Sequence, residues 1–107
     1  MEPLLLFLSL LSPEPPLVEA ACIRAQEAAV VWAHIRPTGE PWWAVVEAPL
    51  LGHAYAELLA DGPQPWDGWL ASPPHRLVLE YPIAGYGFCR QGTFAALYVR
   101  VAPEDMR

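Results

Sequence analysis

The order of apolar stretches and turn signals is the feature that most constrains the fold of this chain. Stretches with a period of two, typical of strands, alternate with two stretches of period near 3.6, typical of amphipathic helices. Read from the N-terminus, the predicted order is strand, helix, hairpin, helix and further strands within 107 residues. A chain of this length forms one domain with a real core. We therefore predict a single α+β domain over residues 1–107, with a flexible acidic tail from about residue 103.

The N-terminal third predicts a strand and then a helix. We interpret the apolar run within Met1–Ser12 as a buried strand. The alternative is a signal peptide, but Glu2 is the only charge before the run, so the basic segment typical of a signal peptide is missing. The run is also too short to span a bilayer. The prolines at 13, 15 and 16 fit only the first turn of a helix. On a 3.6-residue period the following apolar face consists of Leu17, Val18, Ala21, Cys22, Ala25, Ala28 and Ala29. The opposite, polar face carries Glu19, Arg24, Gln26 and Glu27.

The middle of the chain predicts a hairpin, a second helix and a long loop. Residues 30–36 and 41–47 alternate with a period of two around Arg36-Pro37-Thr38-Gly39, a type I turn sequence. Pro49 then opens a helix that ends near Gly62. Residues 61–76 are rich in Pro, Gly and Asp and predict a loop.

The last part predicts three strands. Leu77–Tyr81 is one, and residues 86–90 and 93–101 form a hairpin around Gln91-Gly92. The βαββαβ order is ferredoxin-like. We predict an antiparallel sheet of four to five strands, two helices on one face and an extra C-terminal hairpin. The other face would be open, as in dimeric α+β barrel proteins, a comparison of topology alone.

Composition favours association and disfavours nucleic acid. Apolar residues make up 54% of the chain and charged residues 17%, so polar surface is scarce for a monomer, and we expect a homodimer or a protein partner. The net charge is −6, lysine is absent and the six arginines are scattered, which is unlike a phosphate-binding surface. We also expect no membrane partner. The lack of lysine and the 13 prolines are typical of GC-rich, thermophilic bacterial genomes.

Because the N-terminal run is interpreted as a strand and not as a signal peptide, we expect a cytoplasmic protein, and the cysteines indicate no disulfide framework. Cys22 and Cys89 are far apart, without a CxxC motif or a disulfide-rich pattern, so a disulfide is compatible with the sequence but not expected. Cys89 as a nucleophile would need a neighbouring histidine, and a small buried cysteine is the commoner outcome. Serine chemistry lacks a Gly-x-Ser-x-Gly motif.

The three histidines predict neither a metal site nor a cofactor. His34, His53 and His75 fall in different predicted elements and lack the i, i+4 spacing of helical metal ligands. Tyr86 lies between two glycines that permit close backbone approach but form no phosphate cradle, because no helix follows them. We expect no catalytic residues.

Aromatic side chains are the best candidates for a binding surface, since they make up 11% of the chain. The loop with Trp66 and Trp69 could fold over the hairpin with Trp42 and Trp43 and make a lidded pocket. The candidate ligand-binding or partner-binding residues are Trp32, His34, Arg36, Trp42, Trp43, Trp66, Trp69 and Tyr86.

Two functions follow from this interpretation. The first is a non-catalytic binding or assembly module that acts as a homodimer or complex subunit through an aromatic sheet face. The alternative is a small enzyme of the dimeric α+β barrel type, using His34 or His53 as an acid or base on an apolar small molecule. This alternative requires a histidine and a carboxylate within hydrogen-bond reach of each other.

Overall fold

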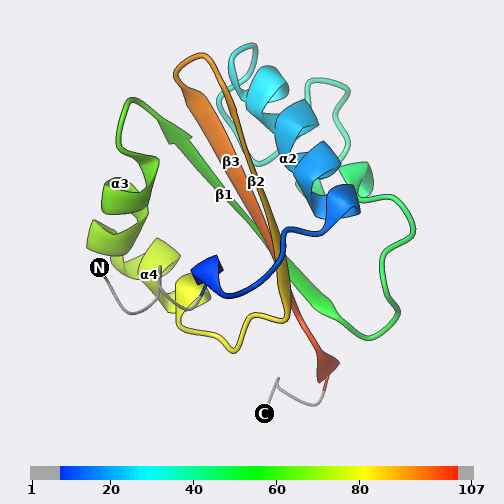
Figure 1. Ribbon diagram of the computed structural model, residues 1–107. Helices are drawn as coiled ribbons and strands as arrows, with labels where there is room; N and C mark the ends of the chain where they lie inside the picture. Colours follow the sequence, from blue (N-terminus) through cyan, green and yellow to red (C-terminus); the bar gives the residue numbers. More distant parts are fainter. Residues whose placement is uncertain (1–7, 104–107) are drawn as a thin grey trace.

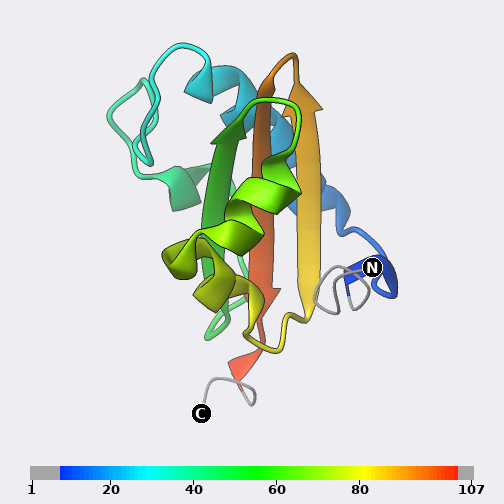
Figure 2. The same cartoon turned by 90° about the vertical axis from the view of Figure 1, so that its left-hand side faces the viewer.

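The computed structural model describes residues 8–103 and shows three layers, with a small sheet between helices (Figure 1). Helix α2 covers one face of the sheet, and α3 and α4 cover the other, with α3 crossing in front of the strands in Figure 2. The elements in chain order are α2 (Pro15–Ala28), the 3-10 helix η1 (Trp42–Val45), β1 (Ala54–Asp61), α3 (Pro65–Ala71), α4 (Pro73–Leu79), β2 (Gly85–Gln91) and β3 (Phe94–Val101).

The sheet is antiparallel in the order β1-β3-β2, so the last strand is the central one. Its register places Ala54 opposite Val101 on one side of β3 and Gly85 opposite Arg100 on the other. Both faces of β3 are buried. Leu97 packs into the core beneath α3 and α4, and Tyr98 packs into the core beneath α2.

Helix α2 lies close to the sheet because its inner face is made of small residues. Pro15 and Pro16 occupy its first turn, where a missing N–H costs nothing. The buried alanines of this face are Ala20, Ala21, Ala25 and Ala28. Opposite them Gly87 has no side chain, and a Cβ there would lie 2.1 Å from the carbonyl carbon of Leu17. Glycine is therefore required where the helix crosses β2.

The second helical layer is two short helices, each opened by a proline. Trp69 on α3 is 2% exposed, and its indole Nε1 donates to the carbonyl oxygen of Leu59 at 3.0 Å. Leu59 lies on an edge strand, and this bond gives its outward-facing carbonyl oxygen a hydrogen-bond donor.

The ferredoxin-like prediction is wrong in strand number and in layering. Within residues 8–103 the structure has three strands where four to five were expected, and helices lie on both faces of the sheet. Without an open sheet face, the predicted homodimer loses its structural basis. The Tyr98 side chain, on the central strand β3, lies in the core beneath α2 and not on an open face.

Three misassigned segments account for this error. The predicted hairpin of residues 30–47 is a loop followed by the 3-10 helix η1, with an isolated bridge between Ile35 and Pro41. The predicted turn at Arg36–Gly39 is present, because the Gly39 amide donates to the Arg36 carbonyl oxygen at 2.8 Å. The predicted helix from Pro49 is largely strand β1, whose pairing with β3 outweighs its helical periodicity.

The predicted loop of residues 61–76 contains α3 and the start of α4, and the predicted strand Leu77–Tyr81 overlaps the end of α4. Prolines that favour a loop in isolation are at the first helical turn here. The predicted first strand, Met1–Ser12, and the acidic tail fall largely outside the described residues. Within the described part Leu8 and Ser9 are helical. Helix α2 and the β2–β3 hairpin are confirmed.

Candidate functional site

A histidine and a buried glutamate meet beside the sheet. Glu57 lies on β1 with a fully buried side chain, and the His34 side chain, in the loop after α2, is 54% exposed. The His34 Nδ1 atom is 2.8 Å from Glu57 Oε1. An ionised carboxylate only accepts, so Nδ1 carries a proton, and in the neutral form of the ring Nε2 has the lone pair.

Two other side chains fix this carboxylate in place. Arg24 Nε donates to Glu57 Oε2 at 2.8 Å, Arg24 Nη2 donates to Oε1 at 3.2 Å, and the Tyr98 hydroxyl lies 2.6 Å from Oε2. Burial alone would lower the pKa of Arg24, but its hydrogen bonds and ion pair with Glu57 raise the pKa overall. Burial, followed by the hydrogen bond to Glu57, raises the pKa of Tyr98, which keeps its hydroxyl protonated. The glutamate is thus a rigid support for the imidazole.

The same arginine ties the His34 loop to α2. Arg24 Nη2 donates to the carbonyl oxygen of Ala33 at 2.7 Å, next to His34 in the chain. Glu27, one turn after Arg24, accepts from Arg24 Nη1 at 3.0 Å and from Arg36 Nη2 at 2.9 Å. Hydrogen bonds from Arg36 are the main reason that the pKa of Glu27 is lowered.

His34 lines a cleft in the surface, and a second imidazole, that of His75, lines the same cleft. His75 lies on α4, with Nδ1 2.8 Å from the hydroxyl oxygen of Ser72. This histidine cleft has a volume of about 260 Å³ and is lined by Trp32, Ala33, His34, Leu59 and His75.

Burial, and then the charge of His34, lower the pKa of His75. A neutral His75 keeps a nitrogen lone pair at neutral pH. The cleft therefore presents two imidazoles from distant parts of the chain, and one of them is held by a carboxylate. Such a pair can bind a cation that prefers nitrogen ligands, or can accept a proton.

The predicted site residues do not form one site. Trp32 and His34 line the histidine cleft, and Arg36 is held by Glu27. Trp42 and Trp43 belong to η1, where their rings pack edge to face with centroids 5.5 Å apart.

The remaining three lie with the other core. Trp66 and Trp69 are on α3 and pack against Phe88, and Tyr86 on β2 packs against the same core cluster. The lidded pocket of four tryptophans is not formed, because α3 and η1 belong to different packing clusters.

The sequence analysis did not predict the buried ion pair of Arg24 and Glu57 beside His34. Arg24 was expected on the polar face of α2, yet it is fully buried, and Glu57 was expected within a helix. Nothing in the sequence links two charges 33 residues apart.

A second, apolar cleft has a volume of about 390 Å³ and lies between η1 and β1. Its lining residues are Trp42, Trp43, Val46, Pro49, Leu50, Leu51, Gly52, His53 and Tyr55. Gly52 has a φ of 82°, which favours glycine at this turn. The third histidine, His53, is thus separated from the histidine cleft.

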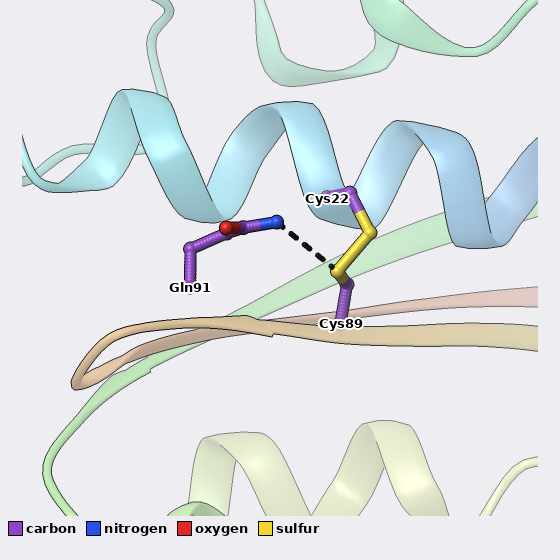
Figure 3. Close-up of a disulfide and its surroundings, with 3 residues drawn as sticks. All are labelled: Cys22, Cys89 and Gln91. Carbon is purple, nitrogen blue, oxygen red and sulfur yellow. Dashed lines mark hydrogen bonds between the residues drawn. A yellow bond between two sulfur atoms is a disulfide. The ribbon is translucent and has the colours of Figure 1, made fainter.

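Cys22 on α2 and Cys89 on β2 form a disulfide that joins the helix to the sheet (Figure 3). Gln91 Nε2 lies 3.7 Å from the Cys89 sulfur. The bond excludes Cys89 as a free nucleophile in this state. Disulfides persist in oxidising compartments, so the structure contradicts the predicted cytoplasmic location.

Within residues 8–103, no three His, Cys, Asp or Glu side chains gather closely enough to hold a metal ion together. No helix in this part of the chain is both long and apolar enough to cross a bilayer.

Comparison with known proteins gives a fold and no sequence relative. No protein-family model and no curated protein sequence matches the chain. A solved structure, an extracellular protein containing an SCP domain from Bacillus anthracis str. Ames, is similar with a TM-score of 0.71 and 16% identity. The match covers 86% of this chain and 33% of that one, so this chain spans about a third of its neighbour's length. The fold is therefore similar to that of part of this extracellular protein, and the similarity contradicts the ferredoxin-like and cytoplasmic predictions.

Proposed function

We propose that this chain is an extracellular, non-catalytic binding module whose site is the histidine cleft. The Cys22–Cys89 disulfide supports an oxidising location, and the structural neighbour is an extracellular protein. The observation that carries the proposal is the presence of His34 and His75 in one cleft, with His34 held 2.8 Å from Glu57.

The chemistry of the cleft suits a divalent transition-metal ion. Imidazole nitrogen is a preferred ligand of zinc, copper and nickel. A ligating histidine usually donates its other ring N–H to a carboxylate, as His34 does to Glu57. With two protein nitrogens, the remaining coordination positions are left for water or a partner's groups.

Isothermal titration calorimetry with Zn²⁺ tests this proposal. The wild-type protein should bind one ion, and His34→Ala and His75→Ala should each weaken binding at least tenfold. His53→Ala is the matched control, because His53 lies outside the cleft, and it should bind as the wild type does. No binding by the wild type, or equal loss in all three variants, contradicts the proposal.

A second candidate is an enzyme that uses His34 as a general base. It is favoured by the same 2.8 Å contact, which is the histidine–carboxylate pair that this function requires. Hydrolysis of p-nitrophenyl acetate, measured against pH, tests it. Turnover that is lost in His34→Ala and retained in His53→Ala supports the enzyme, and equal rates in both variants argue against it.

A further inference from the structure

The apolar cleft between η1 and β1 combines exposed apolar walls with two polar groups. The Trp43 side chain is 58% exposed, Leu50 is 49% exposed and Leu51 is fully exposed. Large apolar side chains rarely gather at a surface without a binding role. The volume, about 390 Å³, falls in the range of small-molecule sites.

Both polar groups of the cleft are hydrogen-bond donors. Arg100 Nη1 lies 2.9 Å from His53 Nδ1. A guanidinium only donates, so Nδ1 accepts and the ring's remaining proton is on Nε2. The Tyr55 hydroxyl accepts from the Leu50 amide at 3.0 Å, which leaves its own proton to donate.

We propose that this cleft binds a small aromatic molecule that carries a carboxylate or carbonyl group. Trp42 and Trp43 form an edge-to-face pair that offers ring surfaces to an aromatic body. The acceptor group of the ligand accepts from Tyr55 and His53. This site is separate from the histidine cleft and does not depend on the metal proposed there.

Calorimetry with 2-naphthoate and with 2-naphthylmethylammonium tests the proposal. The two probes share a ring system and differ in the sign and hydrogen-bonding role of the polar group. The protein carries a net charge of −6, so long-range attraction alone favours the ammonium. The proposal predicts the reverse, with naphthoate bound at least tenfold more tightly.

Variants locate the binding. Tyr55→Phe keeps the ring and removes the donor, so it should weaken naphthoate binding about tenfold. Leu50→Ser should weaken the binding of both probes, because it removes part of the apolar wall of the cleft. Leu77→Ser is its control, because Leu77 is 63% exposed on α4 and does not line the cleft.

Three outcomes would overturn the proposal. They are tighter binding of the ammonium, naphthoate binding that Tyr55→Phe leaves unchanged, and a dimer in sedimentation that Leu50→Ser dissociates. The last would show that a second copy of the chain occupies the cleft.

Discussion

Removal of the Cys22–Cys89 disulfide should cost this protein much of its stability. The bond joins residues separated by 67 positions in the sequence. In the chain-entropy model, a loop of this length restricts the unfolded chain by about 4 kcal/mol. The free energy of unfolding of such a domain is about 5–15 kcal/mol. The double variant Cys22→Ala/Cys89→Ala should therefore be less stable by about 4 kcal/mol.

Urea unfolding followed by tryptophan fluorescence measures this loss. The free energies extrapolated to water should be compared instead of the midpoints, because a cross-linked unfolded chain exposes less surface and changes the slope. Either single alanine variant should lose about as much as the double variant, since the bond needs both sulfurs. A loss below about 1 kcal/mol, or two reactive thiols in the unreduced denatured wild type, would refute the reasoning.

Three further predictions concern packing and charge. Gly87→Ala should destabilise by about 3 kcal/mol or more, since its Cβ would overlap the α2 backbone, whereas Gly68→Ala, with open space around it, should be neutral or slightly stabilising in thermal unfolding. Glu57→Gln should cost about 3–5 kcal/mol in urea unfolding, because it leaves Arg24 buried without a counter-charge. The pKa of Glu27 is lowered in the folded protein, so its ionised carboxylate stabilises the fold at a pH above its ordinary pKa of 4.5. This stabilisation should be lost as the pH falls through the lower pKa of the folded state. The acid unfolding curve of Glu27→Gln should not show this loss.

The sequence predicted those elements whose local pattern agrees with their packing. Helix α2 has a small-residue face and prolines in its first turn, and the β2–β3 hairpin alternates around a glycine turn. In Ala54–Asp61 the apolar residues fit a helix and a strand equally, and only pairing with β3 decides. Short-range periodicity could not reveal that partner.

The candidate site was less predictable than the fold. His34 was named from the sequence, but its carboxylate partner Glu57 and the neighbouring His75 come from segments 23 and 41 residues away. The burial of Arg24 depends on Glu57, so neither charge could be assigned to the interior from its own neighbours.

The position of β3 also determines when this chain can fold. Strands β1 and β2 hydrogen-bond to β3 and not to each other, and β3 is the last of the strands described within residues 8–103. During synthesis the sheet therefore has no centre until residues 94–101 have left the ribosome. Until then the edges of β1 and β2 that pair with β3 have no strand partner.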